Sequence, residues 1–184
     1  MTAEQVNADG TPFVANLPTE EVFTSPDWRR AEGTLRTTAS FFLMDMNALV
    51  EGLELELNDG AIRTAKANRG EAEVQRQLDS VPRARHLGEV ALVDSESRVR
   101  RTGLTFNDML YDENVGCHVA WGAGFPTAFD GGLRLDPQSR IDAGLNQAAT
   151  HVDVVVGSPD VEVDGVDRSG HRIPVIRGDQ FVLT

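Results

Sequence analysis

Residues 49–68, LVEGLELELNDGAIRTAKAN, contain the pattern that best indicates the fold. Leu53, Leu55 and Leu57 alternate with polar residues, which is typical of a strand with one buried face, because successive side chains of a strand point to opposite faces. The Asn-Asp-Gly sequence at residues 58–60 follows, and these residue types tolerate the positive φ angles of a tight turn. The stretch therefore predicts a β-hairpin.

Most other segments also predict strands. Strands are expected at residues 34–45, 89–94, 117–122 and 151–158, with more in the tail, 161–183. Helices are expected at 70–80 and 136–145, and residues 106–114 are expected to be helical or irregular. The sum is an α+β fold, richer in strand than in helix, with a bent or barrel-like mixed sheet and a few short helices.

Charge and composition narrow the classes of partner. The formal net charge of −12 disfavours nucleic acid and anionic membrane surfaces, both of which need basic patches. No apolar run approaches the roughly 20 residues of a membrane-spanning helix, and the N-terminus lacks the features of a signal peptide. A single cysteine, Cys117, excludes an internal disulfide framework. These features predict a cytoplasmic protein.

A histidine and a carboxylate begin the strand expected at residues 151–158. His151 and Asp153 share one face of that strand, whereas Val152 and Val154 share the other. Imidazole and carboxylate together suit zinc, cobalt or manganese. An isolated His-x-Asp pair is, however, more often a polar strand end with a hydrogen-bonded histidine.

Other ionisable side chains border apolar runs. Glu89 opens such a run, and burying an unpaired carboxylate costs several kcal/mol, so it needs an arginine, a backbone donor or a metal. His118 taken alone is more often a satisfied core histidine than a ligand. Glu20 and Glu21 precede another apolar segment, and adjacent strand residues face apart, so only one would reach a shared site. With Glu113 close to His118 in sequence, these groups match the inventory of a two-metal hydrolase.

Several blocks of the sequence resemble the thermophilic metallo-aminopeptidases of the aminopeptidase T and aminopeptidase S type. The blocks are NLPTEEVFTSP at 16–26, LGEVALV at 87–93, DEN at 112–114 with a histidine at 118, and GLN at 144–146 leading to HVD at 151–153. They follow the family's order and cover nearly the whole chain from Asn16 onward. The polar N-terminus predicts a flexible segment over residues 1–15, and the resemblance implies a catalytic domain over residues 16–184.

The resemblance also implies an activity, the removal of N-terminal residues from peptides, with two divalent ions (Zn, Co or Mn) as cofactors and a homodimer as the assembly. The implied metal ligands, carried over position by position, are Glu21, Glu89, His118, His151 and Asp153. The motif alignment selects Glu21 rather than Glu20. Glu89 or Glu113 would accept the water's proton and pass it to the leaving amine. Asn146 is a candidate for orienting the metal ligands through hydrogen bonds, and a structural role in a turn is the equally favoured alternative.

Two departures from the family pattern leave other functions open. Phe125 occupies the position of a family tyrosine, seven residues after the ligand histidine, and cannot donate a hydrogen bond to a developing oxyanion. The large N-terminal domain that precedes the first block in family members is also missing, which predicts a fragment, a chain that works with a separate partner, or a free-standing domain. One alternative is an iron-dependent ring-cleaving dioxygenase that uses His118, His151 and Asp153. Another is a vestigial metal-binding or assembly module.

Overall fold

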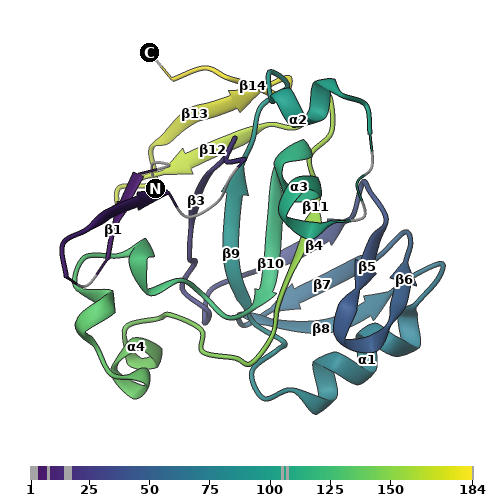
Figure 1. Ribbon diagram of the computed structural model, residues 1–184, viewed down its shortest axis with the longest axis horizontal. Coiled ribbons are helices and arrows are strands. Elements are labelled where there is room, and N and C mark those ends of the chain that lie inside the picture. The colour runs from purple at the N-terminus through teal and green to yellow at the C-terminus, as the bar shows by residue number, and fades with distance from the viewer. Residues whose placement is uncertain (1–3, 8, 15–17, 105, 107, 184) are drawn as a thin grey trace.

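A four-stranded antiparallel sheet lies at the centre of the computed structural model (Figure 1). The structure describes residues 4–7, 9–14, 18–104, 106 and 108–183. The central sheet has the order β11-β10-β9-β3. Its strands are β3 (Val22–Thr24), β9 (Leu87–Leu92), β10 (His118–Gly122) and β11 (His151–Val155). The strands expected around residues 89, 118 and 151 are confirmed.

The register of this sheet determines which side chains share a face. Ala120 of β10 lies opposite Glu89 of β9 on one side and opposite Asp153 of β11 on the other. His118 is two residues from Ala120, and His151 is two residues from Asp153, so the same face carries all of them. The opposite face, with Trp121, Val152 and Val154, packs into the main hydrophobic core.

The predicted hairpin of residues 49–68 is confirmed in a second sheet. This sheet has the order β4-β7-β8 and consists of β4 (Gly33–Arg36), β7 (Glu54–Asn58) and β8 (Ala61–Lys66). Asp59 and Gly60 form the turn, with φ angles of 49° and 70°. A side chain at Gly60 would also collide with the backbone, because an added Cβ would lie 2.1 Å from the Trp28 carbonyl oxygen. Glycine is therefore required there for conformation and for space.

The single strand expected over residues 34–45 is wrong, because the chain changes sheets within it. After β4 the chain leaves the second sheet, and β5 (Phe41–Leu43) pairs with β6 (Ala48–Val50) in a separate hairpin. At the crossing point the Thr37 N–H donates to the Leu53 carbonyl and the Thr38 N–H donates to the Val155 carbonyl. These two contacts connect the second sheet to the edge of the central sheet.

Both predicted helices are present. In α1 (Glu71–Ser80), Val74 and Leu78 are buried. In α4 (Pro137–Asp142), the Asp136 side chain accepts hydrogen bonds from the first turn as an N-cap. The other helical elements are single turns: α2 (Arg98–Arg101), α3 (Met109–Asp112), η1 (Met44–Met46), η2 (Glu113–Val115), η3 (Pro126–Ala128) and η4 (Gly132–Arg134).

Two further small sheets lie toward the ends of the chain. The first pairs β1 (Glu4–Val6) with β2 (Pro12–Val14), and the second has the order β12-β13-β14. The latter consists of β12 (Val163–Val166), β13 (Arg172–Arg177) and β14 (Gln180–Phe181). The segment predicted to be flexible, 1–15, therefore contains a hairpin at 4–14, whereas residues 1–3, 8 and 15 and the start of the first family block, 16–17, lie outside the described residues.

The predicted strand-rich α+β class with short helices is confirmed. Within the described part of the chain the sheets stay separate and do not close into a barrel. No helix among these residues is long and apolar enough to cross a bilayer.

Candidate metal centre

The implied ligands converge on one face of the central sheet. Glu89, His118, His151 and Asp153 project from β9, β10 and β11, and Glu21 immediately precedes β3. The His118 Nε2 atom lies 3.0 Å from Glu21 Oε2. The His151 Nε2 atom lies 3.1 Å from Glu89 Oε2 and 3.2 Å from Asp153 Oδ1. Side chains more than 130 residues apart in sequence thus meet in one cluster.

The ligand atoms of this cluster form overlapping groups of three. Within each group the atoms lie within 4.8 Å of one another, and the groups are Glu21–Glu89–His118, Glu89–His151–Asp153 and Glu113–His118–Asp153. Glu89 belongs to the first two groups. A carboxylate shared between two neighbouring sets of ligands is the arrangement that a bridged pair of divalent ions requires.

Backbone carbonyls fix the orientation of both imidazoles. The His118 Nδ1–H donates to the Gly116 carbonyl at 3.1 Å, and the His151 Nδ1–H donates to the Ala123 carbonyl at 2.7 Å. A carbonyl only accepts, so each Nδ1 carries a proton and each Nε2 faces the carboxylates. A histidine held in this way is prepared to ligate a metal through Nε2.

The donor set fits divalent cations. Four carboxylates (Glu21, Glu89, Glu113 and Asp153) and His118 are each at most 9% exposed. If all four carboxylates were ionised and His118 and His151 both protonated, the cluster would still carry a charge of 2 − 4 = −2. The buried His118 Nε2 and Asp153 Oδ1 atoms lie 3.0 and 3.2 Å from Glu21 Oε2 and His151 Nε2, but no contact of either atom within the described residues has the geometry of a hydrogen bond. Buried charge of this kind is normally compensated by cations, and mixed nitrogen and oxygen donors suit zinc, cobalt or manganese.

Protons compete for the same donors. Burial acts to lower the pKa of His118, but the adjacent Glu21 and Asp153 carboxylates outweigh it and raise that pKa to about 9. Burial also acts to lower the pKa of His151, but the Asp153 and Glu89 carboxylates outweigh it and raise that pKa to about 10. Burial, together with the charges of Asp153 and Glu21, raises the pKa of Glu113 to about 9. Burial also raises the pKa of Glu89.

The two adjacent glutamates of the first family block face apart, as predicted. The Glu20 carboxylate lies outside the cluster, where it accepts a hydrogen bond from Arg98 Nε at 2.7 Å. The Glu20 N–H donates to the Oδ1 atom of the fully buried Asn114, whose Nδ2 donates to the Leu110 carbonyl. Asn114 thereby ties the chain beside Glu21 to the α3 segment.

Asn146 supports the loop that orients His151. Its Nδ2 donates to the Gly122 carbonyl at 2.6 Å and to the Arg83 carbonyl at 3.0 Å. The backbone carbonyl of Asn146 accepts the Gly124 N–H at 2.9 Å. These bonds hold residues 122–124, which include the Ala123 carbonyl that accepts from His151. An effect of Asn146 on the metal ligands stays a prediction.

Phe125 lies directly against the cluster. Its ring packs edge-to-face on the His151 ring, with 4.8 Å between centroids. Phe125 also lines a cavity of about 500 Å³ that opens onto the Glu21, Glu89 and Asp153 carboxylates. Tyr111 does not replace the tyrosine that family members have at position 125. Its ring stacks on Phe106, and it is not among the described residues that line this cavity.

The walls of this cavity include residues that the sequence did not reveal. Besides the carboxylates of Glu21, Glu89, Glu113 and Asp153, the lining comprises Phe13, Phe23, Met109, Leu110, Phe125, Pro126 and Thr127. Met109 and Leu110 belong to α3, which passes in front of β11 in Figure 1. The central sheet thus forms the floor of the site, and a short helical segment lies above it. Nothing in the sequence of such a short apolar helix indicates that it covers the site.

The model of one protein family, the thermophilic metalloproteases (M29), matches residues 1–181. The chain belongs to this family. The resemblance inferred from the sequence blocks is therefore confirmed. The structure is similar to that of wild-type AmpT from Thermus thermophilus, with a TM-score of 0.89 and 36% sequence identity, and the match covers 100% of this chain and 44% of that one.

Curated relatives in the M29 family are named aminopeptidases. The chain is 37% identical over 182 residues to aminopeptidase PepS from Streptococcus thermophilus, covering 99% of this chain and 44% of the relative. It is 39% identical over 168 residues to aminopeptidase T from Thermus aquaticus, covering 91% of this chain and 40% of the relative. The chain thus spans less than half the length of the relatives it matches.

The dioxygenase alternative gains no support. The family match is to metalloproteases, and among the described residues no three-ligand group contains both histidines. A facial triad would need His118, His151 and one carboxylate around a single ion.

Proposed function

We propose that the chain forms the catalytic domain of a metal-dependent aminopeptidase with a centre for two divalent ions. The sharing of Glu89 between two ligand groups is the observation that carries the proposal. Glu21 and His118 would complete one metal site, and His151 and Asp153 the other. The names of the relatives support peptides as the substrates. The catalytic domain would comprise residues 16–184.

Bound divalent ions would polarise the scissile carbonyl and lower the pKa of a water molecule. The protein groups then have separate tasks. The Gly116 and Ala123 carbonyls hold the two imidazoles with Nε2 directed into the site. Glu113 enters the cluster from η2 and lines the cavity beside Asp153. That position suits a carboxyl group that takes a proton from water and gives it to the leaving amine, with Glu89 as the other acid at the same cavity.

The identity of the ions, the assembly and the cellular location extend the same proposal. Zinc, cobalt and manganese all fit a set of carboxylate and imidazole ligands. We propose a cytoplasmic location, and the negative net charge disfavours nucleic acid and anionic membranes as partners. We further propose that the chain forms a homodimer, as the family resemblance implies, or that it associates with a protein equivalent to the N-terminal portion of its longer relatives.

Elemental analysis of the purified chain tests the metal centre. About two divalent ions per chain are expected, and Asp153→Ala should reduce that number. His171→Ala is the matched control, because His171 is exposed in a turn and outside all three ligand groups. A folded chain that binds no divalent ion would contradict the proposal.

Hydrolysis of aminoacyl amides by the metal-loaded chain tests the activity separately. Metal-dependent release of the N-terminal residue is expected, and Glu113→Gln should reduce the turnover per bound metal ion, with metal content measured on the same preparation. Full metal loading with no turnover would instead support the vestigial module that the Phe125 substitution suggests.

A further inference from the structure

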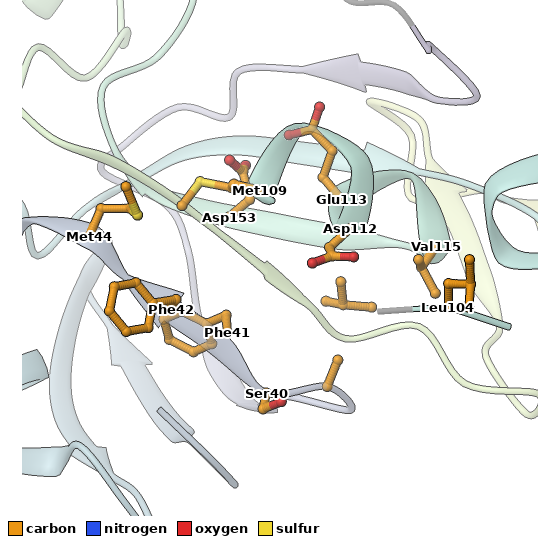
Figure 2. A pocket seen from close by; sticks show the side chains of 12 residues that line it. Ser40, Phe41, Phe42, Met44, Leu104, Met109, Asp112, Glu113, Val115 and Asp153 are labelled. Atoms are coloured by element: carbon orange, nitrogen blue, oxygen red, sulfur yellow. The ribbon is translucent and has the colours of Figure 1, made fainter. Parts of the chain in front are cut away.

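A second, smaller pocket adjoins the metal centre (Figure 2). It has a volume of about 110 Å³ and shares Met109, Glu113 and Asp153 with the larger cavity. The two spaces therefore lie on either side of these three residues. The rest of the lining comprises Ala39, Ser40, Phe41, Phe42, Met44, Leu104, Asp112, Val115 and Val155.

The lining is apolar where it faces away from the metal centre. Figure 2 shows Phe41 and Phe42 on the opposite side of the pocket from Asp153 and Glu113, with Met109 beside Asp153 and the Glu113 carboxylate pointing away from the two rings. Phe42 is 36% exposed and Met44 is 69% exposed. Large apolar side chains gathered around one hollow at a reactive centre are characteristic of a binding site.

The one other carboxylate in the lining is already engaged. Asp112 Oδ1 accepts the Phe106 N–H at 2.9 Å, and Asp112 Oδ2 accepts the Asp108 N–H at 3.2 Å. The two backbone hydrogen bonds partly satisfy the Asp112 carboxylate, which weakens its attraction for a cationic side chain at that end of the pocket. Most of the remaining wall is aliphatic or aromatic, so the pocket favours an apolar occupant.

We propose that this pocket binds the side chain of the substrate's N-terminal residue and selects branched or linear aliphatic side chains such as those of leucine and methionine. The inference rests on the proposed aminopeptidase function and adds its substrate class. An apolar cavity of about 150 Å³ accommodates benzene, so 110 Å³ suits an aliphatic side chain better than an aromatic one. The larger cavity has a volume of about 500 Å³ and is lined by Phe23 and Phe125. It would hold the rest of the peptide, which is the leaving group of the reaction.

Binding of uncleavable amino alcohols to the zinc-loaded full chain tests the inference by isothermal titration calorimetry. L-leucinol is expected to bind at least about 10-fold more tightly than L-alaninol, because each methylene that enters an apolar pocket contributes roughly that factor. Ala39→Phe should fill the pocket and bring the two affinities to within about 2-fold. Ala39 is exposed, so the larger side chain displaces no core residue.

Two further variants make the result specific. Ala143→Phe adds the same side chain at another exposed alanine outside both cavities, and should keep the leucinol preference. Phe42→Ala removes one wall and should weaken leucinol binding about 10-fold while sparing alaninol. Equal affinities of the unmodified chain for leucinol and alaninol would overturn this inference, as would a leucinol preference that survives Ala39→Phe. Neither result would overturn the proposed function. A chain that binds no zinc would overturn the proposed function and this inference together.

Discussion

The metal-free protein should lose stability as the pH rises from 6.5 to 9, and bound divalent ions should remove most of that loss. In the folded chain the pKa of His118 is raised from 6.5 to about 9, that of His151 from 6.5 to about 10, and that of Glu113 from 4.5 to about 9. Between pH 6.5 and 9 the folded state therefore holds more protons than the unfolded state. The free energy of unfolding must then fall as the pH rises.

The size of the loss follows from the same shifts. The three groups share one cluster, so their protons are not independent, and we count a single excess proton in the folded state. One proton held from pH 6.5 to 9 corresponds to about 3 kcal/mol. Typical domains are stable by only about 5–15 kcal/mol. Divalent ions displace these protons and bind only the folded cluster, so a saturating ion should flatten the pH dependence.

Urea unfolding followed by tryptophan fluorescence measures this effect. The free energy of unfolding should be determined at several pH values from 6.5 to 9, with chelator and with a saturating divalent ion. His118→Asn should reduce the slope in chelator, whereas the exposed His171→Ala should preserve it. A free energy that stays constant or rises with pH in chelator would refute the reasoning, as would identical slopes with and without metal.

Three substitutions test other parts of the site. Phe125→Tyr should raise kcat of the metal-loaded chain by about 10²–10³ with little change in KM, and unchanged kcat on aminoacyl amides would exclude an oxyanion role at that position. Asn146→Ala should lower the free energy of unfolding by roughly 2–4 kcal/mol, since it leaves buried carbonyls unpaired; a loss below about 0.5 kcal/mol in urea would argue against the hydrogen-bond network. Gly88→Ala should lower both stability and metal affinity, because its Cβ would lie 2.1 Å from the Ala123 carbonyl oxygen that orients His151. An unchanged dissociation constant for the metal in this variant would show that the position of the Ala123 carbonyl does not affect metal binding.

Local patterns predicted the elements whose partners are close in sequence. The alternating leucines and the turn at residues 58–60 specify their own hairpin, since strand and turn signals lie within one stretch. The N-cap Asp136 and the buried pair Val74 and Leu78 are equally local. The break after Arg36 could not be predicted, because it depends on the Val155 carbonyl, which accepts the Thr38 N–H from 117 positions away.

The site divides in the same way. Strand periodicity correctly placed His151 and Asp153 on one face, and the family blocks identified the residues that gather around them. Their coordination of metal stays a prediction. The Ala123 carbonyl that fixes His151 is a backbone group, and no residue type marks it. The position of Met109 above the sheet depends on how the chain returns between β9 and β10, which a sequence pattern does not encode.

Ala120 of β10 lies between Glu89 of β9 and Asp153 of β11, and its methyl group is fully buried. A valine or leucine there would project upward into the volume that the ions need, because strand side chains stand nearly perpendicular to the sheet. Such a chain could retain all the acids and imidazoles of the centre and still be closed to metal. A relative with a branched side chain at this position is therefore expected to bind no metal, even where every ligand is retained.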